Sequence, residues 1–120
     1  MKYMLMIYGN KEYWNSFSEE DFAKVIVEHA AFDKEIRESG EYVGGEGLAF
    51  EDEAKVVRVR DGAKVVTDGP YLESREFIGS FYMVDCETPE RAYDLAARLP
   101  AARFNGVEVW PVMSRAGEEM

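Results

Sequence analysis

Cysteine, histidine and proline are scarce in this 120-residue chain, which has one cysteine, one histidine and four prolines. The single cysteine, Cys86, excludes a disulfide within the chain and a cysteine-rich zinc site, and it fits a reducing cytoplasm. We expect Cys86 to serve as a small buried hydrophobe rather than as a nucleophile. One histidine among scattered acids is not typical of a metal site, so we expect no bound metal ion.

Basic residues are also few, since 14 lysines and arginines accompany 24 aspartates and glutamates, for a formal net charge of −10. Affinity for nucleic acids comes mostly from basic side chains that neutralise phosphates, so we expect no nucleic-acid partner. The same charge disfavours an anionic membrane surface. The sequence has no run of about 18 apolar residues and no basic, apolar leader, so we expect neither a membrane span nor a signal peptide. It also lacks a glycine-rich phosphate or dinucleotide motif, and we expect no cofactor.

The hydrophobic pattern predicts one domain over residues 1–113, followed by a polar tail over residues 114–120. Ser18 is a typical N-cap and Gly40 a typical residue after a helix, which predicts a helix between them. Asp61-Gly62 is typical of a two-residue hairpin turn, and Thr88-Pro89 of a helix start. The expected strands span residues 2–8, 41–48, 55–60, 63–67, 77–85 and 106–113.

The order of these elements predicts an α+β fold of the ferredoxin-like split β-α-β type with an inserted β-hairpin. Two helices cannot easily cover both faces of a four-stranded sheet, so we expect both on one face. The strand over residues 2–8 is apolar on both faces, which leaves a second apolar face to bury. A second copy of the chain would cover it, and we therefore predict a homodimer through the sheet face.

The first long helix carries the most informative residue. Its apolar stripe is expected to consist of Phe22, Val25, Ile26, Ala30, Phe32 and Ile36. His29 falls near the middle of that stripe, and Asp33 lies one turn later on the same side. Two interpretations stay open: a general base oriented by a carboxylate, which would raise its pKa, or a core histidine bonded to a backbone carbonyl.

A second informative stretch is Asp68-Gly69-Pro70-Tyr71, which must turn or extend because proline restricts the residue before it. It is either an ordinary connection between strands or a loop that holds Asp68, Tyr71 and Glu73 over a pocket. Further candidates for binding a substrate are Glu46, which lies among strand glycines, and Arg58.

Several short motifs together resemble the YCII-related family, and more narrowly its DGPF branch. They are Met1 to Gly9, Gly44-Gly45-Glu46-Gly47-Leu48, Val57 to Gly62, Thr67 to Tyr71, Gly79-Ser80-Phe81-Tyr82 and Pro100-Ala101-Ala102-Arg103. The resemblance covers residues 1 to about 113 and implies a dimeric α+β barrel of ferredoxin-like subunits. In this chain the motif ends in Tyr71 instead of phenylalanine.

The resemblance also implies two hypotheses about function. Some members carry a helix histidine, matched here by His29, that is proposed to act with an aspartate, and one relative dehydrochlorinates a chlorinated hydroxyquinone. This implies a cofactor-free lyase or other acid–base enzyme that uses His29 with Asp33 or Asp68 on a small molecule. Genes of the DGPF branch often adjoin genes for extracytoplasmic-function sigma factors. This setting implies the alternative hypothesis: a dimer that binds a ligand or regulates, without catalysis, and that has a sigma factor as its partner.

Overall fold

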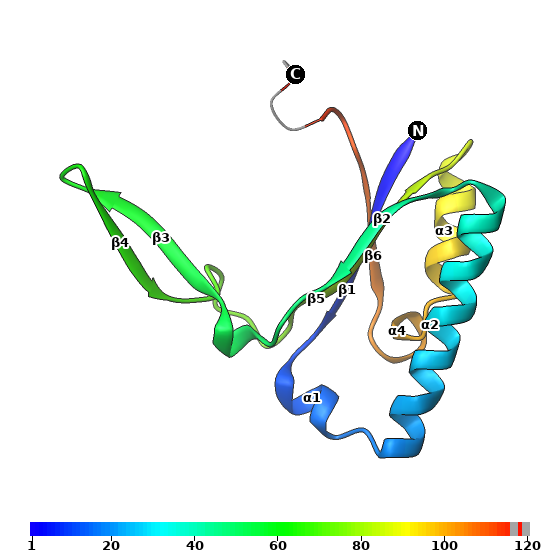
Figure 1. Cartoon of the computed structure of the whole chain (residues 1–120), viewed down its shortest axis with the longest axis horizontal. Coiled ribbons are helices and arrows are strands. Elements are labelled where there is room, and N and C mark those ends of the chain that lie inside the picture. The colour runs from blue at the N-terminus through cyan, green and yellow to red at the C-terminus, as the bar shows by residue number, and fades with distance from the viewer. Residues whose placement is uncertain (116–117, 119–120) are drawn as a thin grey trace.

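The fold, taken from a computed structural model that describes residues 1–115 and 118, is of the expected α+β type. A four-stranded antiparallel sheet has the strand order β2-β5-β1-β6, which is the ferredoxin-like order. Its strands are β1 (Lys2–Gly9), β2 (Tyr42–Gly47), β5 (Phe77–Asp85) and β6 (Val107–Pro111). Both long helices, α2 (Glu19–Ser39) and α3 (Pro89–Ala97), lie on the same face of this sheet (Figure 1).

Local signals in the sequence position these helices as expected. The Ser18 hydroxyl accepts a hydrogen bond from the backbone N–H of Asp21, and Gly40 ends α2 with a positive φ of 82°. The Thr88 hydroxyl caps α3 in the same way, by accepting from the N–H of Arg91. Two short helices, α1 (Lys11–Asn15) and α4 (Ala101–Phe104), were not predicted.

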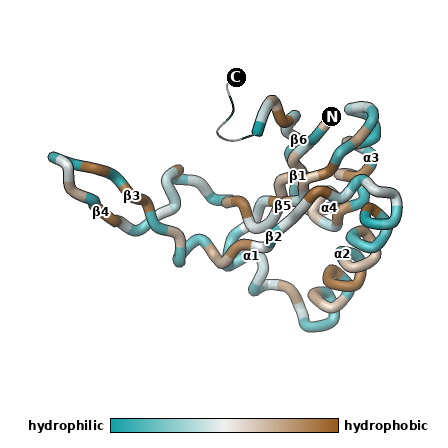
Figure 2. Tube along the Cα trace, turned by 45° about the horizontal axis from the view of Figure 1, so that its top comes forward, coloured by the Kyte–Doolittle hydropathy of each residue, from teal (hydrophilic) through white to brown (hydrophobic). Residues whose placement is uncertain are grey.

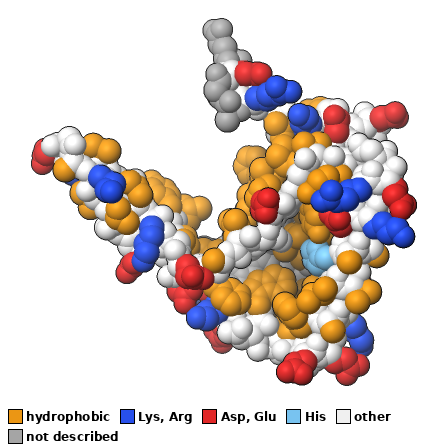
Figure 3. Space-filling view, viewed as in Figure 1, with side chains coloured by type: hydrophobic (Ala, Val, Ile, Leu, Met, Phe, Trp, Pro, Cys, Tyr) orange, Lys and Arg blue, Asp and Glu red, His pale blue; other side chains and the backbone are white. Residues whose placement is uncertain are grey.

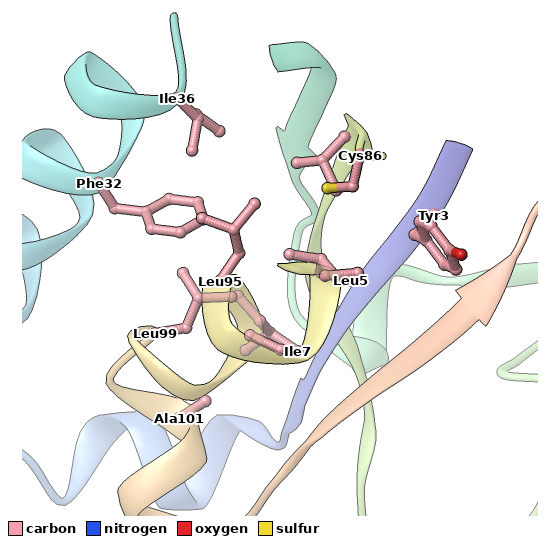
Figure 4. Packing of buried hydrophobic residues seen from close by; sticks show 12 residues of the cluster. Tyr3, Leu5, Ile7, Phe32, Ile36, Cys86, Leu95, Leu99 and Ala101 are labelled. Atoms are coloured by element: carbon pink, nitrogen blue, oxygen red, sulfur yellow. The ribbon is translucent and has the colours of Figure 1, made fainter. Parts of the chain in front are cut away.

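The core lies between the sheet and the two helices (Figure 4). Alternation along β1 sends Tyr3, Leu5 and Ile7 into it, where each is at most 2% exposed. The helices contribute Phe32, Ile36 and Leu95, the turn after α3 contributes Leu99, and β5 contributes Val84, all of them buried. Cys86 is also buried, with its thiol against the Glu41 carboxylate, which agrees with the expected structural role.

The amino-terminal half of α2 differs from the expectation. Phe22 and Ile26 are 48% and 54% exposed, and Ala30 is exposed as well, so only the Phe32 and Ile36 end of the predicted stripe is fully buried. The reason is geometric, since the first turns of α2 extend past the end of the sheet (Figure 1). Apolar and polar residues still alternate along the whole helix (Figure 2).

The inserted hairpin forms a separate two-stranded sheet of β3 (Lys55–Arg60) and β4 (Ala63–Asp68). Its turn has φ values of 51° at Asp61 and 77° at Gly62, as the Asp-Gly pair predicts. A short 3-10 helix, η1 (Glu51–Glu53), precedes it. The hairpin projects away from the rest of the chain (Figure 1).

None of the helices in the described part of the chain is sufficiently long and apolar to cross a membrane. Of the predicted polar tail over residues 114–120, residues 116, 117, 119 and 120 lie outside the described residues.

Candidate functional site

His29 lies at a cavity of about 360 Å³ between α2 and the sheet edge formed by β2 and β5. Three elements supply its lining: His29, Asp33 and Arg37 from α2, Tyr42 and Gly45 to Gly47 from β2, and Ser80 to Tyr82 from β5. In the space-filling view the histidine reaches the surface beside hydrophobic side chains (Figure 3). A cavity of this volume is within the range that holds small organic ligands.

The imidazole of His29 is held by Tyr82. Its Nδ1 lies 2.9 Å from the Tyr82 hydroxyl, and the two rings are nearly parallel, with an interplanar angle of 15°. Tyr82 stands opposite Leu5 across the β1–β5 pair, which places it on the helix-facing side of the sheet. Phe32 supports the same tyrosine through an edge-to-face contact at 5.0 Å between ring centroids. His29 is therefore hydrogen-bonded by a phenol, not by a carboxylate or a backbone carbonyl.

Gly45 makes room for this tyrosine. A Cβ atom at position 45 would lie 2.8 Å from the carbonyl oxygen of Phe81 and 3.1 Å from Cδ1 of Tyr82. Contacts that short with a backbone atom require the strand to shift. Glycines within a strand often mark a close approach to the backbone or a bulge, and β2 has both: β5 lies close to Gly45, and the register shifts between Tyr42 and Gly44.

We therefore expect Gly45→Val to disturb the site more than a neighbouring substitution. The valine side chain pushes Tyr82 away from His29, so the ring signals of His29 in NMR spectra should shift and the melting temperature should fall. Gly47→Val is the matched control, because a Cβ atom there meets nothing within 4 Å. Identical His29 spectra for the two variants would contradict this role of Gly45.

Burial lowers the pKa of His29 below its ordinary value of 6.5, and the negative charge of Glu28 offsets the shift in part. Glu28 is itself paired with Arg103, whose guanidinium lies 2.8 Å from one carboxylate oxygen. The imidazole is therefore neutral at pH 7, the state in which it can accept a proton.

The two predicted aspartate partners are engaged elsewhere. Asp33 lines the His29 cavity, but its Oδ2 accepts a hydrogen bond from Arg37 Nε at 2.8 Å. Asp68 does not reach His29 within the chain. It ends β4 opposite Lys55, whose ammonium lies 2.6 Å away, and its side chain is 89% exposed. Pairing with Lys55 lowers the pKa of Asp68.

The predicted loop borders a different cavity. Pro70, Tyr71 and Leu72 form one wall of a cavity of about 570 Å³, which Tyr8 and Phe77 close from the sheet side. Glu73 lies in the same loop and is exposed, and Arg58 extends from β3 with its guanidinium 5.8 Å from the centre of the Tyr71 ring. The sequence suggested one pocket near His29 and this loop, whereas in the structure the His29 cavity and the loop cavity are separate and share no lining residue.

Of the predicted binding residues, Glu46 alone borders the His29 cavity, from the edge strand β2. Sequence reasoning missed Tyr82, which it assigned to the core or an interface, and Arg37, which stacks on Tyr42 at 3.9 Å. One signal could have found Tyr82: a tyrosine on the buried face of a central strand needs a partner for its hydroxyl. Among the described residues, no three histidine, cysteine, aspartate or glutamate side chains are grouped so as to hold a metal ion.

Comparison with known proteins identifies the family. The sequence model of the YCII-related domain matches residues 1–115. The chain belongs to the YCII-related family. An uncharacterized protein of Rhizobium meliloti (strain 1021) is 28% identical over 102 residues, which cover 85% of this chain and 82% of that protein. Membership of the narrower DGPF branch stays a prediction.

Proposed function

We propose that this chain binds a small organic molecule in the His29 cavity and that His29 exchanges a proton with it. The observation that supports the proposal most strongly is a half-buried imidazole, held at Nδ1 by Tyr82, at a cavity large enough for a ligand. When Nδ1 donates its proton to the Tyr82 oxygen, the lone pair of Nε2 is free to accept a proton from the ligand.

The lining indicates the class of ligand. Tyr42 and Tyr82 present aromatic surface, and the Arg37 guanidinium supplies a cation at the same cavity. A planar ring with an acidic or anionic group matches both features. The resemblance to a dehydrochlorinase of a chlorinated hydroxyquinone agrees with this class. In such an elimination the ring reacts as a keto tautomer in which the C–Cl carbon and its C–H neighbour are saturated. His29 takes the proton from that neighbour, the electron pair forms the double bond, and chloride leaves.

The binding step can be tested with the chain labelled at its one histidine. We expect a chlorinated hydroxyquinone, or related ring compounds with an acidic hydroxyl, to shift the His29 ring signals in a saturable manner. His29→Gln should weaken or abolish binding of the same compounds, as measured by calorimetry. Compounds that bind the parent chain and the His29→Gln variant equally, and leave the His29 signals of the parent unshifted, would contradict the proposed site.

A non-catalytic role is the second candidate, and the state of Asp33 favours it. Because Arg37 already holds the Asp33 carboxylate, that residue is less able to stabilise a protonated His29. In this case the bound molecule is recovered chemically unaltered, and the chain passes the binding signal to a protein partner such as a sigma factor. Turnover that depends on His29 would rule this candidate out.

We also propose that two copies pair through the open face of the sheet. Met4 and Met6 of β1, Phe81 and Met83 of β5, and Trp110 of β6 share this face by register, and none of them is fully buried within one chain. Trp110 is 57% exposed. The face also carries Glu108 opposite Met6, and Glu108 accepts hydrogen bonds from Tyr8 and Trp110. An exposed face that is otherwise apolar is typical of an interface.

Met6→Glu tests this pairing, because Met6 lies on the central strand β1. We expect the variant to fold, since the side chain is only half-buried in one chain, but to sediment as a monomer where the parent sediments as a dimer. A carboxylate buried between two sheets without a partner is strongly unfavourable. A Met6→Glu variant that still dimerises with unchanged affinity would show that the copies pair elsewhere.

A further inference from the structure

The β3–β4 hairpin, which we call the arm (residues 55–68), is a two-stranded sheet separate from the main one. It stands clear of the rest of the chain in the space-filling view (Figure 3). A lone two-stranded hairpin is marginally stable in water, and it gains stability when another surface packs on one of its faces. The arm therefore has a structural need for a partner surface.

One face of the arm has the composition of a buried face. The register places Val57 opposite Val66 and Val59 opposite Lys64, so these four side chains share that face. The side chains of the three valines are exposed: the exposed fraction is 60% for Val57, 67% for Val59 and 51% for Val66. The opposite face is partly covered within the chain, since it carries Val56, which is half-buried beside Gly69, and Arg58, which lies near Tyr71. The valine face is the uncovered one.

The charge of the arm is opposite to that of the rest of the molecule. The arm contains four basic residues, Lys55, Arg58, Arg60 and Lys64, and two acidic ones, Asp61 and Asp68. The remainder of the chain then has ten of the 14 basic residues and 22 of the 24 acidic ones, a formal charge of −12 against +2 for the arm. Among the described residues, the guanidinium of Arg60 at the tip donates to the neighbouring carbonyl of Val59 and to no acidic side chain. Its charge is thus available to another molecule.

We propose that the arm docks on the acidic body of a second copy of this chain. The face formed by Val57, Val59 and Val66 packs against that copy, and Lys64 on the same face pairs with one of its carboxylates. Charge complementarity favours a second copy as the partner, because the remainder of that copy, with a formal charge of −12, attracts a basic arm. In a two-fold dimer each copy gives one arm and receives one. The proposal needs a second copy but does not require pairing through the open sheet face.

Substitutions on the valine face test this proposal in the full chain. We expect Val59→Glu to weaken self-association at least about tenfold in sedimentation equilibrium, because an apolar contact is replaced by an unpaired carboxylate. Val27→Glu on α2 is the matched control, since Val27 is 66% exposed and Val59 is 67% exposed. Circular dichroism verifies that both variants fold. Association of Val59→Glu equal to that of the control would overturn the proposal, as would a parent chain that is monomeric.

A cross-linking experiment identifies the contact directly and separates it from the sheet-face pairing. Light and 15N-labelled chains are mixed and treated with a carbodiimide, which joins an amine to a carboxylate in direct contact. We expect Lys64 to be joined to glutamates or aspartates of the other isotope. If Lys64 were joined only to carboxylates of chains with the same isotope, the docking of the arm would be contradicted, even where the copies still pair through the sheets.

Discussion

Phe32→Ala is expected to lower the free energy of unfolding by about 3–5 kcal/mol, as large-to-small substitutions of buried aromatic residues do. Phe32 is 2% exposed, and it fills the space between α2 and the sheet with Leu95 and Leu99 (Figure 4). The alanine leaves a cavity in that space and removes the edge support of Tyr82. Urea denaturation followed by circular dichroism measures the loss of stability.

The same helix offers a matched control for this substitution. Phe22 is 48% exposed because α2 extends past the end of the sheet at that point. We expect Phe22→Ala to change the stability by less than about 1 kcal/mol, as is usual for surface positions. Equal losses for the two variants would contradict the position of the core, and would indicate that Phe22 is buried in the protein in solution.

His29→Gln is the substitution with the largest expected effect on activity. If the bound molecule is turned over, loss of the base should lower kcat/KM by about 10²- to 10⁴-fold, the usual contribution of a general acid–base group. Glutamine keeps a polar side chain of similar reach but cannot accept a proton at pH 7. The assay follows chloride release from a chlorinated hydroxyquinone, or loss of whichever ring compound shifts the His29 signals.

Asp68→Asn is the control for this experiment, and it also tests the role that the sequence suggested for Asp68. Because Asp68 pairs with Lys55 at the base of the arm, we expect unchanged kcat/KM and only a small loss of stability, as for other exposed ion pairs. A loss of activity in Asp68→Asn as large as that in His29→Gln would show that Asp68 reaches the site, by way of a second copy.

Most of the fold was predictable because its signals are local. Ser18 and Gly40 delimit α2 through their own backbone and hydroxyl chemistry, and Asp61-Gly62 fixes the hairpin turn. Period-two alternation in β1 could not show which face packs on the helices, because both faces are apolar, and the structure has Tyr3, Leu5 and Ile7 on that face. The exposure of Phe22 and Ile26 could not be predicted, because periodicity describes one face of a helix and not how far the sheet extends beneath it.

The candidate site was predictable only in part. His29 was identified because an imidazole on an apolar stripe is uncommon, whereas its partner depended on which strand lies under α2. Sequence distance made Asp33 the nearest candidate, but Arg37, also one turn away, takes its carboxylate. The Asp68 loop was placed beside His29 because it precedes β5. In the structure, β5 leads away from that loop. Tyr82, farther along the same strand, is the residue that is hydrogen-bonded to His29.

The most direct test of this account is the pKa of His29, measured by NMR titration of its ring signals in the folded chain. We predict a value below 6.5, because burial disfavours the charged imidazole and Tyr82, a neutral group, is its partner. The unfolded chain then binds a proton more readily, so the free energy of unfolding should fall as the pH drops from above about 6.5 through the folded pKa. A value above 6.5 that returns to normal in Asp33→Asn would contradict the account, since it would show a carboxylate at His29 and a charged imidazole near neutral pH.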